Sequence, residues 1–233
     1  MAGSAKFTLS PRALADPFWD AMLMPTDERQ PERERLFAQL SGLETLREKA
    51  DYNTGSIWVS AAWCLYSLVR HFRLSRALEV GTFIGKSTFA MAAAMDDGGH
   101  PGEVFTCDMS NSLDLPWSGR TQITQFKATS STAMLEKLDG VFDFAFFDGR
   151  IQPQEIGRLE QLLAPDAIIA LDDFEGIEKG VANLSLLRQS ARFKNHALIY
   201  PCPRELLERR GFSSYSLTAA LIPPSRLQIA AQG

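Results

Sequence analysis

One stretch in the first half of the chain combines an apolar run, a glycine turn and the start of a helix. Residues 77–80 suit a buried parallel strand, Gly81 to Gly85 form the turn, and a helix is predicted from about Ser87. Glycines in such a turn adopt unusual backbone angles and let a ligand come close to the main chain. The unpaired N–H groups at the helix start point back at the turn. This pattern predicts a cradle for a nucleotide-like cofactor; the alternative is an ordinary strand-to-helix turn without a ligand.

The spacing of the glycines separates the classes of cofactor site. A Walker-type phosphate loop needs one residue more than the three between Gly81 and Gly85-Lys86-Ser87. The dinucleotide fingerprint G-x-G-x-x-G needs a glycine where Phe83 stands. The stretch Glu79-Val-Gly-Thr-Phe-Ile-Gly-Lys-Ser87 resembles instead the first motif of class I S-adenosylmethionine (SAM) methyltransferases. It is most similar to the subgroup of catechol, caffeoyl-CoA and macrocin O-methyltransferases.

Apolar runs alternate with helical patterns along the rest of the chain. After 77–80, strands are predicted at 104–107, 122–126, 142–147, 167–171, 197–200 and 214–222. A helical stripe follows the fifth strand, made of Ile177, Val181, Leu184 and Leu187. Strands that alternate with helices predict an α/β fold with a doubly wound parallel sheet. The resemblance implies a mostly parallel, Rossmann-like sheet of seven strands with helices on both faces and an antiparallel last strand.

The N-terminal part of the chain has a different pattern. Residues 1–30 contain three prolines and little periodicity, which favours an irregular arm. Phe18 and Trp19 lie in it, and we expect them to pin the arm to the body rather than to form a lid. From Pro31 onward, leucines at three- and four-residue steps predict an amphipathic helix.

These patterns predict two parts. An N-terminal arm and helical extension would span residues 1–52, and a SAM-binding methyltransferase domain would span residues 53–233.

Charge and cysteine content exclude some classes of partner. The net charge is −4 without a basic run, so neither nucleic acid nor an anionic membrane is an expected partner. The three cysteines are scattered and lack metal-ligand spacing, which favours a reducing compartment. The first residues lack the apolar core of a signal peptide. We therefore expect a cytoplasmic protein.

Acidic residues follow three of the predicted strands. Asp108 ends the second strand, Asp148 follows the fourth, and Asp172 and Asp173 follow the fifth. Ligands of an open parallel sheet bind beyond the carboxyl ends of its strands. Neighbouring carboxylates repel one another unless a positive charge or a hydrogen-bond donor lies among them. The set therefore indicates a functional site, although each aspartate alone could be a turn residue.

The fold and the resemblance assign the cofactor residues. Asp108 lies 27 residues after Gly81, where a Rossmann-like fold places the acid that binds the ribose hydroxyls. The resemblance implies that Met109 packs on the adenine and that Ser130 bonds the adenine amino group. The full cofactor-binding set predicted is Gly81, Thr82, Phe83, Gly85, Ser87, Asp108, Met109, Ser130, Asp148 and Arg150.

The resemblance also implies a metal site. Asp148, Asp172 and Asp173 match the divalent-metal ligands of the subgroup, and oxygen ligands suit Mg²⁺ or another hard divalent cation. The metal would lower the pKa of a substrate hydroxyl, with Asp148 as the catalytic residue. Where relatives have a catalytic Lys or His, this chain has Ile151. Either the carboxylates suffice, or the acceptor is already acidic, or metal-dependent catalysis is lost.

The predicted function is SAM-dependent methyl transfer to a hydroxyl of a small molecule, assisted by a divalent metal. One alternative is a P-loop-like nucleotide hydrolase, because residues 168–171 and the following acids also look like a Walker-type strand. Another is a non-catalytic member of the fold that binds SAM or a partner protein. The resemblance further implies a homodimer.

Overall fold

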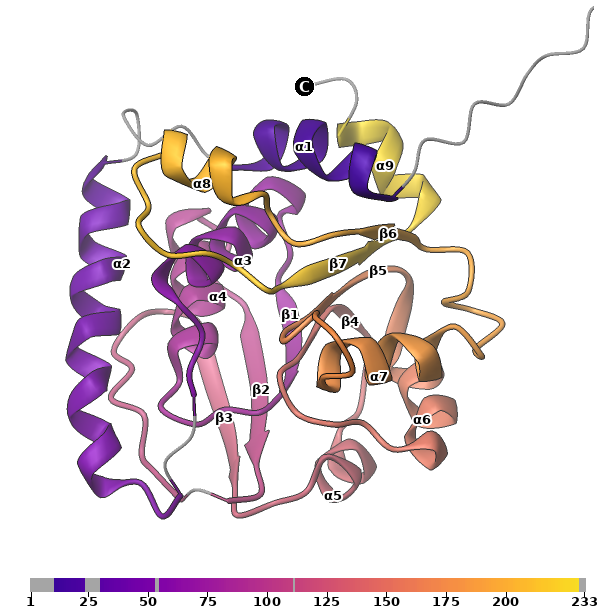
Figure 1. Ribbon diagram of the computed structural model, residues 1–233. Helices are drawn as coiled ribbons and strands as arrows, with labels where there is room; N and C mark the ends of the chain where they lie inside the picture. The colour runs from indigo at the N-terminus through magenta and orange to yellow at the C-terminus, as the bar shows by residue number, and fades with distance from the viewer. Residues whose placement is uncertain (1–10, 24–29, 53–54, 111, 231–233) are drawn as a thin grey trace, which may run out of the picture.

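The computed structural model describes residues 11–23, 30–52, 55–110 and 112–230 (Figure 1). Its centre is a seven-stranded sheet with the strand order β3-β2-β1-β4-β5-β7-β6. The strands are β1 (Arg76–Val80), β2 (Glu103–Asp108), β3 (Gln122–Lys127), β4 (Phe142–Phe147), β5 (Leu163–Leu171), β6 (Ala197–Ile199) and β7 (Ala219–Ile222).

Strand direction confirms the predicted sheet. Strands β1 to β5 pair in parallel, whereas β7 runs antiparallel to both β5 and β6. The chain order reverses at β1, which lies between β2 and β4. In an open parallel sheet this switch point leaves a crevice beyond the carboxyl ends of the two diverging strands. A ligand site is therefore expected at the ends of β1 and β4.

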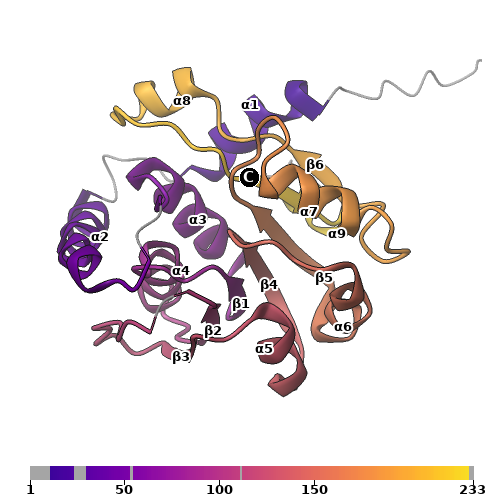
Figure 2. The same cartoon turned by 60° about the horizontal axis from the view of Figure 1, so that its bottom comes forward.

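Helices cover both faces of the sheet (Figure 2). The helices are α1 (Pro11–Met22), α2 (Gln30–Leu43), α3 (Val59–Phe72), α4 (Lys86–Asp97), α5 (Ser131–Lys137), α6 (Ile156–Leu162), α7 (Lys179–Leu187), α8 (Arg204–Arg209) and α9 (Pro224–Ala230), with 3₁₀ turns η1 (Glu44–Lys49) and η2 (Pro153–Glu155).

Each face of the sheet has its own apolar core. Phe144 and Phe146 of β4 pack in the core shared with α1 to α4, whereas Ala145 and Phe147 pack in the core shared with α5 to α7. This division follows from the strand geometry, since successive side chains point to opposite faces. Because both faces are covered, β4 is apolar along its buried length apart from Asp143.

The N-terminal segment differs from the prediction. Residues Pro11–Met22 form helix α1 rather than an irregular arm. Pro11 is at the first helical position, where no N–H is needed, so it does not oppose the helix. Pro17 lies inside α1. The prolines therefore gave a misleading signal.

Phe18 and Trp19 pin this helix to the body, as predicted. Both side chains are buried, and Trp19 Nε1 donates to the carbonyl oxygen of Tyr200 at 2.8 Å. The residue-52 domain boundary itself stays a prediction.

The predicted stripe of the helix after β5 is wrong at its first position. Ile177 is 90% exposed and precedes α7, which begins at Lys179. Leu187 is buried as expected. The last strand is also shorter than predicted, because β7 begins at Ala219.

A helix that crosses a membrane must be both long and apolar. None in the described part of the chain is long and apolar enough to cross a bilayer. The cytoplasmic location stays a prediction.

We expect Trp19→Ala to lower the free energy of unfolding by about 3–5 kcal/mol, because it leaves a cavity and removes a hydrogen bond. Urea denaturation measures this change. Trp58→Ala is the matched control, since Trp58 is 54% exposed and should contribute far less. If Trp19→Ala lowers the free energy of unfolding as little as Trp58→Ala is expected to, α1 does not stabilise the body.

Candidate functional site

The glycine turn brings the ends of β1 and β4 together. Gly81 has φ +105°, and its N–H donates to the carbonyl oxygen of Cys107 at 2.9 Å. A Cβ added at Gly81 would lie 3.0 Å from backbone atoms of Asp148 and Gly149. Both the positive φ and this close approach favour glycine. Asp148 therefore lies directly beside the turn, as predicted.

Asp108 holds the turn from the end of β2. Its Oδ2 accepts from the Phe83 N–H at 2.7 Å, and its Oδ1 accepts from the Ser110 N–H at 2.8 Å. A carboxylate can accept several hydrogen bonds at once, so the group is chemically suited to accept from ribose hydroxyls. The predicted ribose acid is thus fixed in orientation.

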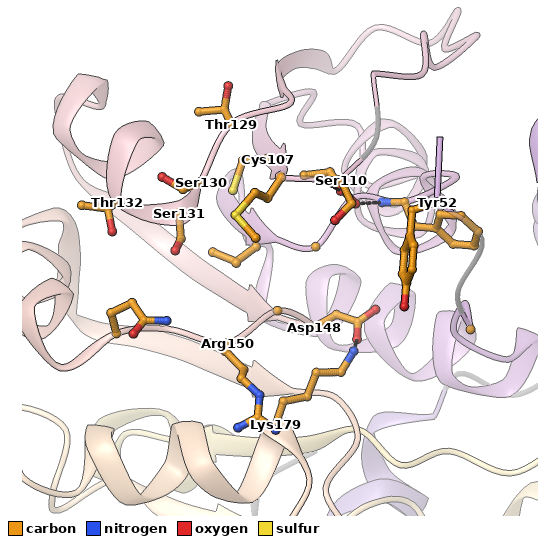
Figure 3. A pocket seen from close by; sticks show the side chains of 18 residues that line it. Tyr52, Cys107, Ser110, Thr129, Ser130, Ser131, Thr132, Asp148, Arg150 and Lys179 are labelled. Atoms are coloured by element: carbon orange, nitrogen blue, oxygen red, sulfur yellow. Dashed lines mark hydrogen bonds and ion pairs between the residues drawn. The ribbon is translucent and has the colours of Figure 1, made fainter. Parts of the chain in front are cut away.

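A cavity of about 590 Å³ opens beside this turn (Figure 3). The structure brings together seven of the ten predicted cofactor residues around it. They are Gly81, Phe83, Asp108, Met109, Ser130, Asp148 and Arg150. The size and mixed lining suit a nucleoside-sized ligand.

The other three predicted cofactor residues do not line this cavity. Thr82 is buried, and its hydroxyl shares a hydrogen bond with that of Thr106. Ser87 is also buried, and Gly85 packs under Leu115, 2.5 Å from where its Cβ would be. These residues shape the turn from behind, and their contact with a cofactor stays a prediction.

The other lining residues are not among those that the sequence predicted for the site. They are Tyr52, Gly55, Val80, Cys107, Ser110, Thr129, Ser131, Thr132, Gly149, Gln152 and Lys179. Most come from loops, where no periodicity marks which side chains face inward.

Glu79 is a buried acid behind the turn. It is fully buried in β1, and Oε2 accepts from the Thr88 hydroxyl of α4. Burial raises the pKa of Glu79 to about 7, although the hydroxyls of Ser87, Thr106 and Thr88 oppose this. In the sequence, Glu79 is the first residue of the motif that ends at Ser87, but it is not among the predicted cofactor residues. It links β1 to α4 behind the glycine turn.

A second cavity of about 340 Å³ adjoins the first. It shares Gly55, Asp148 and Lys179 with the larger one. Trp58 and Tyr215 line it, with ring centroids 5.9 Å apart and planes tilted by 45°. Both rings are partly exposed, at 54% and 44%. They offer an aromatic surface for a ring or an apolar group.

Two of the three predicted metal aspartates contact a lysine. Lys179 Nζ lies 2.6 Å from Asp148 Oδ1 and 3.1 Å from Asp173 Oδ2 (Figure 3 shows the first contact). Asp172 is buried and accepts from the Thr218 hydroxyl at 2.6 Å. The structure therefore brings the aspartates together around an ammonium group that the sequence did not reveal.

Burial and mutual repulsion act on these groups. Burial raises the pKa of Asp148, and the neighbouring Asp172 raises it further. Burial likewise raises the pKa of Asp172, against the hydrogen bond from Thr218. Burial opposes the charge on Lys179, but Asp148 and Asp173 outweigh it and raise the pKa of this lysine.

The metal prediction is not confirmed by this geometry. Among the residues that the structure describes, no three His, Cys, Asp or Glu side chains form a group that could hold a metal ion. The carboxylates Asp148 and Asp173 are directed at Lys179 instead. In this arrangement the residues do not fit a bound divalent cation.

Two further positions bear on the alternatives. Lys86, where a phosphate-binding loop has its lysine, is buried and pairs with Glu44 rather than lining the cavity. This argues against a nucleotide hydrolase.

Ile151 is buried, and its N–H donates to Asn183 Oδ1 at 3.1 Å. The position where the resemblance implies a base thus holds a buried apolar residue.

The central part of the chain matches a known protein family. Residues 78–174 match a family model described as a methyltransferase domain, and this segment contains the glycine turn and all four aspartates. No curated protein sequence matches the chain.

Two solved structures are similar in fold. An O-methyltransferase from Bacillus cereus in complex with SAH has a TM-score of 0.56 and 15% identity, covering 80% of this chain and 91% of that chain. A putative O-methyltransferase from Klebsiella pneumoniae has a TM-score of 0.50 and 15% identity, covering 91% and 96%. The chain therefore has the Rossmann-like fold of these methyltransferases, as the sequence predicted, and the methyltransferase-domain model matches its central part.

Glu79 should make stability depend on pH. Because folding raises its pKa from 4.5 to about 7, the folded protein holds this proton more tightly than the unfolded chain. Its stabilising contribution is complete below pH 4.5 and is lost as the pH rises through about 7. Between pH 5 and pH 8 we expect wild type to lose about 2–3 kcal/mol relative to Glu79→Gln.

Urea denaturation of both proteins across this pH range provides the measurement. Asp148 and Asp172 titrate in both, so they cancel in the comparison. Parallel pH profiles for wild type and Glu79→Gln would contradict the raised pKa.

Proposed function

We propose that the protein transfers the methyl group of SAM to a hydroxyl group of a small molecule. The observation that carries this proposal is the pair of adjoining cavities that meet at Asp148 and Lys179. A methyl donor in the larger cavity and an acceptor in the smaller one would have their reacting groups at this junction. Methyl transfer needs such alignment more than it needs reactive side chains.

The larger cavity suits SAM. Asp108, fixed by two backbone N–H groups, is expected to accept from the ribose hydroxyls. Exposed Met109 offers an apolar surface to the adenine, and Ser130 also lines this cavity. The similar protein from Bacillus cereus is described in complex with SAH, the demethylated product of SAM. We infer that SAM occupies this cavity.

The smaller cavity suits the acceptor. Trp58 and Tyr215 would flank a planar or apolar group and leave its hydroxyl at the junction. The hydroxyl oxygen forms a bond to the methyl carbon, and the methyl–sulfur bond breaks with its electron pair left on sulfur. Asp148 is the carboxylate placed to take the hydroxyl proton. No metal enters this step, because Asp148 and Asp173 are directed at Lys179.

The partners and the location of the protein remain predictions. We expect a small-molecule acceptor, a homodimer, neither nucleic acid nor a membrane as partner, and a cytoplasmic location. The acceptor prediction is supported by the modest size of the smaller cavity, about 340 Å³.

Detection of the product SAH tests the proposal directly. The full chain is incubated with SAM and a panel of phenols and sugars, and SAH is quantified by mass spectrometry. We expect SAH release that depends on the acceptor. SAM binding without release of SAH for any acceptor would favour the non-catalytic alternative. Tight magnesium–ATP binding without SAM binding would instead favour the nucleotide hydrolase.

Asp108→Ala should weaken SAM binding by about 1–3 kcal/mol, because ribose hydroxyls lose a charged acceptor. Isothermal titration calorimetry gives the dissociation constants. Asp114→Ala is the matched control, since this exposed aspartate pairs with Lys127 and does not line the larger cavity. An unchanged affinity for Asp108→Ala would rule out its ribose role.

A further inference from the structure

The ends of β4 and β5 concentrate negative charge in a partly buried place. Asp172 is buried, and the side chains of Asp148 and Asp173 are only 15% and 37% exposed. Carboxylates this close destabilise one another unless a cation lies among them. The fold therefore needs a positive charge among these three carboxyl groups.

The structure supplies the ammonium of Lys179. Its Nζ bridges Asp148 Oδ1 at 2.6 Å and Asp173 Oδ2 at 3.1 Å. These are lengths of N–H···O hydrogen bonds, and the nitrogen takes the place between carboxylates that a bridging ion would need. A metal ion and this ammonium cannot both occupy that place.

The backbone around Lys179 is built for this contact. Lys179 is the first residue of α7, and a Cβ added at the following Gly180 would lie 2.2 Å from the carbonyl oxygen of Asp172. Because residue 180 is a glycine, the first turn of α7 can pack against the end of β5. Asn183 ties α7 to the loop after β4, donating to the Gly149 carbonyl at 2.9 Å and accepting from Ile151 N–H. Both strand ends are therefore held against the same helix.

We propose that the Lys179 ammonium replaces the divalent cation, so that the protein neither needs nor binds a metal at this site. An ammonium has three N–H donors, and two of them are directed at Asp148 and Asp173. Lys179 lines both cavities, so its third N–H donates to the acceptor oxygen at their junction. It stabilises the negative charge that develops on this oxygen. The acceptor part of this inference rests on the proposed function; the metal part does not.

Manganese binding tests the replacement without any acceptor. Mn²⁺ is titrated into the full chain, with and without SAM, and free Mn²⁺ is followed by electron paramagnetic resonance. We expect no binding to wild type at micromolar concentrations. Lys179→Ala should bind Mn²⁺ about tenfold more tightly than wild type or better, because Asp148 and Asp173 are then left without their cation. Lys194→Ala, which removes an exposed lysine elsewhere, should behave like wild type.

Lys179→Met gives a second variant of similar length in case the alanine variant does not fold. Micromolar Mn²⁺ binding by wild type, or unchanged Mn²⁺ affinity in folded Lys179 variants, would overturn the proposal.

Methyl transfer gives a second, independent readout. Wild type should keep its rate in the presence of a chelator, whereas Lys179→Ala should lose about 100-fold or more and recover part of it with Mn²⁺. Loss of wild-type activity on chelation would also overturn the proposal. If no acceptor gives SAH but Mn²⁺ binds only to the Lys179 variants, the proposed function fails while the replacement of the metal stands.

Discussion

The contact between Lys179 and the carboxylates at the ends of β4 and β5 is the interaction on which the site depends. Parallel strands deliver their carboxyl ends to one edge of the sheet, so acids that follow neighbouring strands are forced together. Burial raises the cost of their charge. The glycine after Lys179 and the hydrogen bonds of Asn183 keep the compensating ammonium in place.

The same edge of the sheet explains where the two ligands would lie. Gly81 lets the turn after β1 touch the backbone at Asp148, so the larger cavity ends where the acidic cluster begins. One ammonium faces three carboxyl groups there, which leaves an excess of acid. Such an excess favours a positively charged group such as the sulfonium of SAM. The architecture therefore supports methyl transfer even without a bound ion.

The sequence predicted the features that depend on neighbours along the chain. Strand ends, the glycine turn and the positions of Asp108, Asp148, Asp172 and Asp173 follow from local patterns, because apolar runs end where these residues begin. Lys179 could not be predicted this way. It lies 31 residues after Asp148, in a stretch where Ile177 suggested a helix that in fact starts later.

Other differences have similar causes. The turn residues Thr82 and Ser87 fit the motif by position, but their side chains face the buried side of β1 and α4 rather than the cavity. Helix α1 differs from the prediction because three prolines suggest an irregular segment, whereas the packing of Trp19 against the chain near Tyr200 supports a helix. The orientation of these side chains and the formation of α1 depend on tertiary contacts, which cannot be predicted from the periodicity of a single segment.

A crystal structure grown with SAH and Mn²⁺, with anomalous diffraction at the manganese edge, tests the account most directly. The account predicts SAH in the larger cavity, Lys179 Nζ between Asp148 and Asp173, and no anomalous peak among the three aspartates. An anomalous peak bound by Asp148, Asp172 and Asp173, with the Lys179 side chain displaced, would contradict it.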